Sequence, residues 1–246
     1  HKISAVIISL NEERNIQRAI DSLRLVADEI LVYDSYSKDA TPEICRKAGV
    51  KLIQGEWLGY AKTKNKANAL ARHNYILPLD ADEALSNSLQ KRILEEKEKG
   101  LQGAYKMNRL TNYCGKWIYH SGWYPDQKHR LFPKEQVKWV GDWVHEVPKI
   151  PKDMRVNHLA GDILHFSYYS VEEHWQRSQH YAELKAQQFR ENGKQTGFLK
   201  PYLSAFWRFI SMYFLKKGFL DAYYGFKIAQ IAAWASYYHY SLLRKE

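Results

Sequence analysis

The sequence predicts an α/β fold in which a mostly parallel, mixed sheet carries helices on both faces. Over residues 1–100, strand-like and helix-like segments alternate, which is the pattern of a parallel sheet. Residues 4–10 (SAVIISL) form a continuous apolar run, as expected for a strand that is covered on both sides. After Gly100 the segments become short, partly alternating strands, and residues 196–246 are typical of amphipathic helices that extend the fold.

The individual elements follow from hydrophobic spacing and from helix start signals. A helix should begin at Asn11, because apolar residues recur at helical spacing after it, and Thr41 should cap a second helix with Pro42 at its first position. Further helices are expected over residues 62–72, 171–192 and 198–243, the last of them broken at Gly218. Strands are expected over residues 4–10, 29–33, 50–54, 75–79, 104–113, 128–132, 137–140 and 163–168.

The composition describes a folded, basic protein. Of its 246 residues, 45% are hydrophobic and 14% aromatic, which excludes global disorder. Lys and Arg number 37 against 27 acidic residues, giving a formal net charge of +10. Such an excess of positive charge points to a polyanionic partner: nucleic acid, anionic lipid or a phosphorylated glycan. Cys45 and Cys114 lie far apart, so a reduced, cytoplasmic setting is expected.

Three carboxylates follow the strand predicted over residues 75–79. They are Asp80, Asp82 and Glu83, the first two forming a short Asp-x-Asp (DxD) motif. Carboxylates this close repel one another, and a cation between them relieves the repulsion. Hard oxygen ligands suit Mg²⁺ or Mn²⁺, which would also neutralise a ligand's phosphates. The other interpretation is a solvated acidic turn before a helix that begins at Ser86.

Four strand-end segments in the first half of the chain carry polar side chains. They are residues 11–13 (NEE), 34–39 (DSYSKD), 59–65 (GYAKTKN) and 80–83 (DADE). Parallel strands bring their carboxyl ends to the same edge of the sheet, which is where open α/β sheets bind ligands. We therefore expect the four segments to line one cleft.

These segments resemble the inverting glycosyltransferases of family 2, which have the GT-A (Rossmann-like) fold. More narrowly, they are similar to the branch that builds the lipopolysaccharide core, which includes heptose β-1,4-glucosyltransferases. The matching motifs are residues 11–13, 34–35, 39–41, 64–65, 80–83, 122–132 (GWYPDQKHRLF) and 143–146 (WVHE). The resemblance covers most of the chain and departs from the usual pattern at Tyr36 and Lys38. It implies a hexosyltransferase that moves a hexose, with glucose the best fit, from a UDP-sugar donor to a lipopolysaccharide inner-core heptose.

The resemblance also assigns a donor site. Glu13 and Asp34 would hold the uracil and ribose, because a carboxylate accepts hydrogen bonds from both. Asp39 would fix its loop, and Lys64 would lie near phosphate. The full set of implied donor-binding residues is Asn11, Glu13, Asp34, Ser35, Asp39, Lys64, Asn65 and Asp80.

Metal and catalytic residues are implied in the same way. Asp82 would bind the Mg²⁺ or Mn²⁺ ion that stabilises the leaving diphosphate, and His145 would be a further metal or phosphate contact. An inverting transfer needs a base for the acceptor hydroxyl, for which Asp126 is the first candidate and Glu146 the second. Arg130 would meet the departing diphosphate.

We expect a catalytic domain over residues 1–195, with a nucleotide-sugar-binding half (1–100) and an acceptor-side half (101–195). The extension 196–246 is aromatic and basic, with Asp221 and Lys227 among the charges that interrupt it. It should therefore lie in an anionic membrane interface rather than cross the bilayer, and the alternative is helices that only pack. The expected location is the inner face of the cytoplasmic membrane of a Gram-negative bacterium.

Other functions are open. The acceptor could instead be a polyprenyl-linked glycan or another surface polysaccharide. A nucleic-acid-binding module fits the charge and the aromatic residues, but carboxylates at the sheet edge would repel phosphates without a metal, so no nucleic-acid partner is expected. A nucleotidyltransferase should carry a Gly-rich basic turn after the first strand, where this chain has residues 9–13 (SLNEE).

Overall fold

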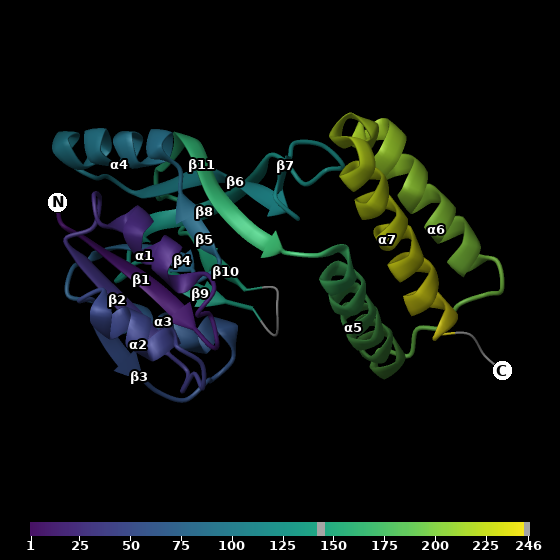
Figure 1. The fold of residues 1–246 in the computed structure, drawn as a ribbon, viewed down its shortest axis with the longest axis horizontal. Helices are drawn as coiled ribbons and strands as arrows, with labels where there is room; N and C mark the ends of the chain where they lie inside the picture. Colours follow the sequence, from purple (N-terminus) through teal and green to yellow (C-terminus); the bar gives the residue numbers. More distant parts are fainter. Residues whose placement is uncertain (142–145, 244–246) are drawn as a thin grey trace. The chain divides into compact units, whose positions relative to one another are not determined.

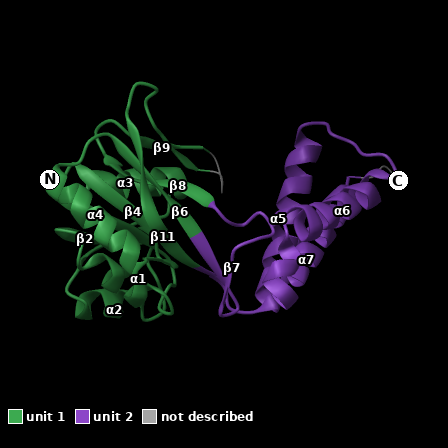
Figure 2. Ribbon diagram, turned by 90° about the horizontal axis from the view of Figure 1, so that it is seen from above, with its two compact units in different colours: residues 1–109, 126–165 green, residues 110–125, 166–246 purple. Residues whose placement is uncertain are grey.

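The computed structural model describes residues 1–141 and 146–243. The chain forms two compact units, each made of two separate stretches of sequence (Figure 2). Unit 1 comprises residues 1–109 and 126–165, and unit 2 comprises residues 110–125 and 166–246. The functional boundary expected at residue 195 stays a prediction. It does not coincide with the boundaries of these two units, which are defined by packing.

Four parallel strands form one half of the sheet. β1 (Ile3–Ser9), β2 (Glu29–Asp34), β3 (Lys51–Gln54) and β4 (Tyr75–Asp80) lie in the order β3-β2-β1-β4. β1 is buried along almost its whole length, because apolar clusters cover both of its faces. The bounds of all four strands differ from the expected ones by at most one residue at either end, which confirms the parallel sheet.

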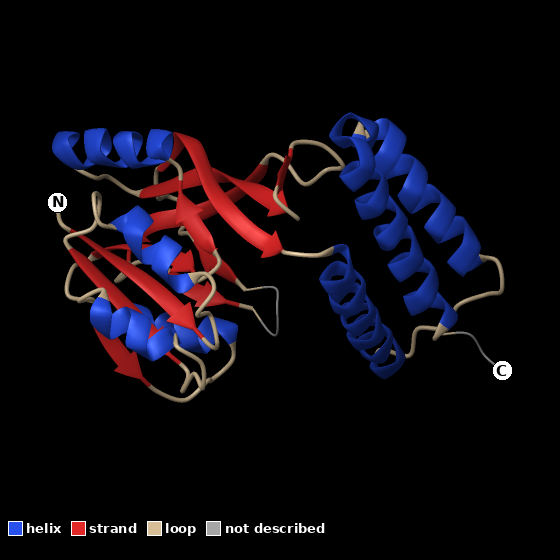
Figure 3. Ribbon diagram, in the orientation of Figure 1, coloured by secondary structure: helices blue, strands red, loops and turns tan. Residues whose placement is uncertain are grey.

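The sheet continues with antiparallel strands, so it is mixed, as expected (Figure 3). β8 pairs antiparallel with both β4 and β6. β6 and β11 begin in unit 1 and continue into unit 2. After β4 the order is β8 (Asp126–Pro133), β6 (Ala104–Tyr113), β11 (Val156–Tyr168) and β5 (Glu83–Leu85), with β7 (Lys116–Ile118) paired to β6. A separate ribbon consists of β9 (Lys138–Val140) and β10 (Val147–Lys149).

Helices cover both faces of the sheet in unit 1. β1 supplies Ile7 to one buried cluster and Val6 to the other, because successive side chains of a strand point to opposite faces. The first cluster also holds residues of α1 (Ile16–Leu23), α2 (Thr41–Lys47) and α4 (Asn87–Lys99), and the second holds residues of α3 (Tyr60–Ala69). This layered arrangement confirms the α/β fold class.

Two helix starts differ from the expected ones. Asn11 adopts a left-handed backbone (φ 54°) in a turn, and α1 begins only at Ile16. Thr41 is the first residue of α2 rather than its cap, because its hydroxyl accepts a hydrogen bond from the Glu12 backbone N–H (2.8 Å) in the preceding loop. Ser86 does cap α4, as in the second interpretation of the acidic segment.

The described residues of unit 2 include three long helices. α6 (Lys200–Ile210) follows α5 (Val171–Glu191) and runs into a π-helical turn over Ser211–Leu215 before α7 (Ala222–Ser241). α7 lies beside both α5 and α6 (Figure 1). The rings of Trp175 and Trp234 (4.8 Å between centroids) join α5 to α7. A hydrogen bond between the hydroxyls of Ser204 and Ser236 (2.7 Å) joins α6 to α7.

The break before α7 is organised by a buried carboxylate. Lys217 has a left-handed backbone (φ 54°), and a single 3-10 turn over Gly218–Asp221 precedes α7. Asp221 is 3% exposed and accepts hydrogen bonds from the backbone N–H groups of Tyr119 (3.3 Å) and His120 (2.9 Å). The turn thereby ties α7 to the segment after β7. Across the part of the chain that the structure describes, no helix combines the length and the apolarity that crossing a bilayer requires.

Two neutral histidines lie inside unit 2. The fully buried Tyr113 places its hydroxyl 2.9 Å from Nδ1 of His174. Burial, with a smaller contribution from the charge of Arg177, lowers the pKa of His174 to about 4. Burial likewise lowers the pKa of His239 to about 4. Both imidazoles are therefore uncharged in the folded protein at neutral pH.

We predict that stability falls as the pH is lowered from about 6.5 to about 4. In this window the histidines bind protons in the unfolded chain but stay neutral in the folded chain. Acidification therefore favours unfolding. His174→Gln should remove part of the slope, up to about 1.4 kcal/mol per pH unit. The measurement is urea unfolding of the full chain at several pH values. His158→Gln, at an exposed position, should keep the wild-type slope. An unchanged slope in His174→Gln would contradict the prediction.

Candidate functional site

The carboxyl ends of β1, β2 and β4 meet at one edge of the sheet in unit 1. Ser9 at the end of β1 lies opposite Asp34 of β2, and Ile8 lies opposite Asp80 of β4. This register brings three of the predicted strand-end segments together, as parallel pairing requires. The fourth segment arrives with α3, whose Lys64 contacts Asp80.

The loops after β1 and β2 are joined by hydrogen bonds between side chains and backbone. Glu13 accepts a hydrogen bond from the backbone N–H of Ala40 (2.9 Å), and Asp39 accepts one from that of Glu13 (3.0 Å). Asn11 accepts one from the backbone N–H of Lys38 (2.9 Å). Asn11, Glu13 and Asp39 therefore tie the two loops to each other, and their contact with a donor stays a prediction.

Asp34 is fully buried, and its carboxylate is already occupied by neighbouring groups. It accepts hydrogen bonds from the Ser9 hydroxyl (3.1 Å), the Gln54 amide (3.1 Å) and the Ser37 backbone N–H (3.0 Å). The Ser37 hydroxyl donates to it as well. Ser35 is buried beside it, with a hydroxyl that has no partner among the described residues. Asp34 thus organises the loop after β2, and the predicted donor contact would require one of these bonds to break.

α3 delivers Lys64 to the sheet edge and Asn65 to the β9–β10 ribbon. The Nζ atom of Lys64 lies 2.8 Å from both Asp80 Oδ1 and Glu146 Oε1, and 4.5 Å from the ring centre of Trp139. The Asn65 amide exchanges two hydrogen bonds with the Trp139 backbone (2.8 and 2.9 Å). Asn65 therefore uses both polar ends of its side chain to hold β9.

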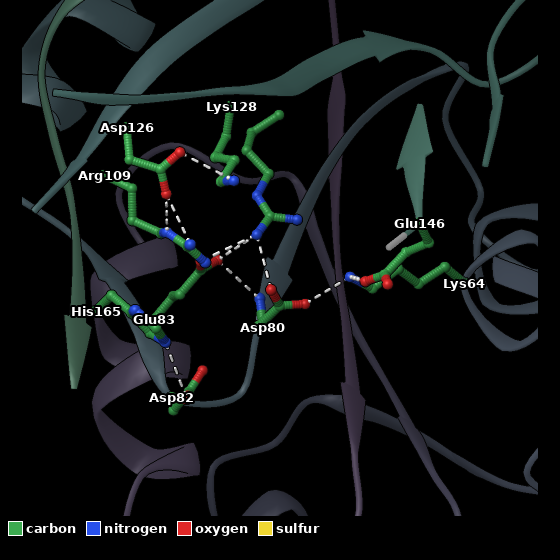
Figure 4. Close-up of polar contacts among 10 residues, drawn as sticks. Lys64, Asp80, Asp82, Glu83, Arg109, Asp126, Lys128, Glu146 and His165 are labelled. Atoms are coloured by element: carbon green, nitrogen blue, oxygen red, sulfur yellow. Dashed lines mark hydrogen bonds and ion pairs between the residues drawn. The ribbon is translucent and has the colours of Figure 1, made fainter. Parts of the chain in front are cut away.

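A cluster of buried charges lies between the ends of β4 and β8 (Figure 4). Arg130 is 4% exposed, and its Nη2 atom lies 2.7 Å from Asp80 Oδ2 and 2.9 Å from Glu83 Oε2. Glu83 is 1% exposed and is also reached by Arg109 (3.4 Å). Burial opposes the charge of Asp80, but Arg130 and Lys64 hold the pKa of Asp80 well below its ordinary value. Burial opposes the charge of Arg130 too, and the two carboxylates raise its pKa.

Asp126, the first candidate for the base, is held by two cations at the start of β8. Arg109 lies opposite it in register and donates to it from Nε (2.9 Å) and Nη2 (2.7 Å). Lys128 contributes a third ion-pair contact (3.0 Å). The side chain of Asp126 is 32% exposed, against 14% for Glu146, the second candidate. Both carboxylates are thus oriented by basic partners.

Asp82, the predicted metal ligand, pairs with a histidine that the sequence did not single out. His165 Nε2 lies 3.2 Å from Asp82 Oδ2, as Figure 4 shows. β11 brings the imidazole there because it pairs antiparallel with β5, which sets His165 opposite Glu83. The other ring nitrogen, Nδ1, is buried and has no partner among the described residues. His145 lies outside the described residues, and within residues 1–141 and 146–243 no group of three or more His, Cys, Asp or Glu side chains could hold a metal ion.

A cavity of about 260 Å³ lies beside the charge cluster. It is lined by Lys64, Asp80, Arg109, Gln127, Lys128, His129, Arg130, Trp139, Glu146, Val147 and Pro148. Four lining residues are Lys or Arg and two are acidic, so the wall carries net positive charge. Such a wall suits an anionic ligand.

Three contributors to the site were missed by sequence reasoning: His165, Arg109 and Lys128. Their strands were expected, over residues 163–168, 104–113 and 128–132, but not their strand neighbours. His165 reaches Asp82 only through the pairing of β11 with β5, and Arg109 reaches Asp126 only through the register of β6 with β8. The sequence indicated the strands that carry these residues. It did not indicate which distant strands pair with each other, because local sequence patterns do not show such pairing.

The fold and the site agree with a family match. The model of the family described as "Glycosyl transferase family 2" matches residues 4–151, a span that holds β1 to β4, the acidic cluster and Asp126. This span is more than half of the chain. The chain therefore belongs to glycosyl transferase family 2 and is a glycosyltransferase.

Relatives extend the similarity beyond that span. An uncharacterised glycosyltransferase of Rickettsia typhi is 28% identical over 264 residues, covering 99% of this chain and 87% of the relative. The lipopolysaccharide core biosynthesis glycosyltransferase LpsC of Rhizobium meliloti is 28% identical over 255 residues, covering 98% of this chain and 93% of LpsC. Among solved structures, glucosyl-3-phosphoglycerate synthase of Mycobacterium tuberculosis with phosphoglyceric acid gives a TM-score of 0.50 at 16% identity, covering 74% of this chain and 78% of that one. This last likeness concerns the fold alone and agrees with the GT-A class.

We predict that Glu83→Gln lowers the free energy of unfolding by about 3 kcal/mol, because it leaves the buried Arg130 with less compensating charge. Urea unfolding of the variant and the wild type measures the difference. The matched control is Glu95→Gln, whose surface ion pair with Arg92 is 46% exposed on the Glu side and should contribute less than about 1 kcal/mol. Equal stability losses in the two variants would show that the cluster around Arg130 contributes no more to the free energy of unfolding than a surface ion pair.

Proposed function

We propose that this chain transfers a hexose, glucose, from a UDP-sugar to the heptose of a lipopolysaccharide inner core, with inversion at the anomeric carbon. One observation carries the proposal: a cation-lined cavity and the Asp82–His165 pair lie at the same edge of the sheet. A nucleoside diphosphate requires both, since cations bind its phosphates and an ion held by side chains neutralises the leaving group.

The charges around the cavity support binding of a diphosphate. Lys64 is clamped between two carboxylates, so a phosphate that reaches it would replace Glu146 as its partner. Arg109 and Lys128 line the same cavity but stay paired with Asp126, so the exchange concerns Lys64. An anionic ligand would replace a carboxylate as the partner of a cation that is already held in place. No flexible cationic side chain would have to become ordered when the ligand binds. Such preorganisation is the main source of electrostatic stabilisation in enzymes.

Asp82 and His165 fit a divalent cation. Mg²⁺ is usually bound through one or two carboxylates together with waters and substrate phosphates, so few protein ligands are needed, and Asp82 would be the main one. The two groups come from different parts of the sequence and lie 3.2 Å apart, close enough to be ligands of one ion, and binding an ion through Nε2 would require the ring proton to be on Nδ1. A bound Mg²⁺ or Mn²⁺ would supply positive charge to the leaving diphosphate.

We assign the general base to Asp126. The base takes the proton of the acceptor hydroxyl as this oxygen attacks the anomeric carbon and the nucleoside diphosphate leaves from the opposite side. Asp126 is the more exposed of the two candidates, and Arg109 and Lys128 fix its orientation. Glu146 is bound to Lys64, which also holds Asp80, so it belongs to the donor side of the cavity.

The relative LpsC supports the acceptor class, because it is named for lipopolysaccharide core biosynthesis and is similar over nearly the whole of both chains. A phosphorylated, lipid-linked glycan is also an anionic acceptor, which suits a chain of net charge +10. Such an acceptor would place the reaction at the inner face of the cytoplasmic membrane. The direct test is consumption of UDP-glucose and of UDP-galactose with a heptose-terminated core acceptor. Consumption of neither sugar would overturn the proposed reaction.

We predict that Asp82→Asn and His165→Gln each weaken UDP binding in the presence of Mn²⁺ by about tenfold or more, because each removes a metal ligand. Binding in excess chelator should be weak and the same in both variants and the wild type. Calorimetric titration of UDP under the two conditions measures this. Asp153→Asn, at an exposed position that is not among the residues of the site, should behave as wild type. Wild-type binding that is indifferent to chelator would refute the metal assignment.

We predict that Asp126→Asn lowers turnover by roughly 10²–10⁴-fold, the usual contribution of a general base, while donor affinity hardly changes. Glu146→Gln should instead alter donor affinity, since it releases Lys64 from one of its two partners. Steady-state kinetics and UDP titration of the two variants separate these effects. If Asp126→Asn loses donor affinity and Glu146→Gln loses only turnover, the two roles are reversed.

A further inference from the structure

α6 and the turns that follow it carry apolar side chains that are exposed in the described part of the chain. Half of the large hydrophobic side chains that are exposed in the described residues fall within positions 198–226. Scattered single residues of this kind need no explanation, whereas a concentration in one segment marks an interaction surface. Six of them are more than 60% exposed: Phe198, Leu199, Leu203, Phe206, Trp207 and Leu215.

The exposed residues of α6 and of its N-cap, Leu199, repeat at helical spacing. Leu199, Leu203 and Trp207 are four positions apart and are 61–63% exposed, and Phe206 beside them is 67% exposed. Another side of the helix packs on α7, where Ser204 forms its hydrogen bond. A helix that packs one face against a neighbour normally presents polar residues on the outward face. The outward face of α6 is apolar as well.

Basic residues border this surface without acidic ones. Lys200, Arg208, Lys216 and Lys217 are exposed, on α6 and just after it. Over the described residues 196–243 the acidic side chain is Asp221, which is buried against backbone N–H groups. The surface is thus apolar, aromatic and cationic, with no exposed negative charge to compensate.

We infer that the surface formed by residues 198–226 docks on the anionic headgroup layer of a phospholipid bilayer, with α6 lying in the interface. Aromatic side chains favour the boundary between headgroups and acyl chains, and neighbouring Lys and Arg contact lipid phosphates. A second copy of this chain is a poorer occupant, because a symmetric contact would set these cations against one another. The inference does not depend on the proposed donor or acceptor.

The test is co-sedimentation of the full chain with phosphatidylcholine vesicles and with vesicles that also contain phosphatidylglycerol. We expect binding to the anionic vesicles that weakens with salt. The double variant Phe206→Ser, Trp207→Ser should reduce partitioning by about tenfold or more, since two large apolar side chains no longer leave water. Lys216→Gln with Lys217→Gln should reduce it by about fivefold per lysine on anionic vesicles only.

Trp57→Ser is the matched control, because Trp57 is 41% exposed in unit 1 and undergoes the same chemical change. It should leave vesicle binding unaltered, and urea unfolding should show that all variants are folded. Failure of the wild type to sediment with anionic vesicles would overturn the inference, as would an equal loss in Trp57→Ser. A dimer in solution that Trp207→Ser converts to monomers, with vesicle binding unchanged, would assign the surface to a second copy instead.

Discussion

The site depends on one buried ion-pair cluster, in which Arg130 of β8 is held by Asp80 and Glu83. β4 and β8 pair through Tyr75 and Ile76, and two residues later Pro78 offers no N–H to continue the ladder. Beyond that point, side-chain ion pairs join the two strands in place of backbone hydrogen bonds. Replacing one member leaves the others with less compensating charge, which is costlier than losing a surface pair. The cluster therefore fixes where the functional ends of β4 and β8 lie.

Local sequence patterns predicted the parallel half of the fold closely. A continuous apolar run such as 4–10 has few alternatives to a buried strand, and parallel strands deliver their carboxyl ends to one edge wherever helices connect them. The acidic cluster after β4 was therefore placed correctly. The start of α1 was not, since hydrophobic spacing does not show that Asn11 lies in a left-handed turn.

The side-chain partners within the site were less predictable. A carboxylate after a strand looks the same in sequence when it is open to a ligand and when, like Asp34, it is filled by Ser9, Ser37 and Gln54. Asn65 is a similar case, because its amide holds the Trp139 backbone. His165 lies at the site because β11 pairs with β5, and the local sequence does not show this pairing. These outcomes depend on contacts between residues far apart in the chain, which periodicity does not record.

The family match ends at residue 151, before α5, α6 and α7 begin, yet relatives such as LpsC are similar over 98% of the chain. The helices α5, α6 and α7 thus lie outside the span that the family model matches and within the span that is similar to LpsC. The proposed docking of residues 198–226 on lipid would therefore belong to a part of the chain outside the matched span.

The strands β6 and β11 run from unit 1 into unit 2, and the chain passes between the units three times. Residues 110–125 are made before β8 and β11, but Tyr113 and His120 find their partners His174 and Asp221 only much later in the sequence. During synthesis, unit 1 is complete when residue 165 has emerged, while the first piece of unit 2 still waits for its helices. For the same reason, no single recombination breakpoint can exchange unit 2 between relatives. The helical unit can be inherited only together with a matching stretch of residues 110–125, so the two stretches must evolve as one.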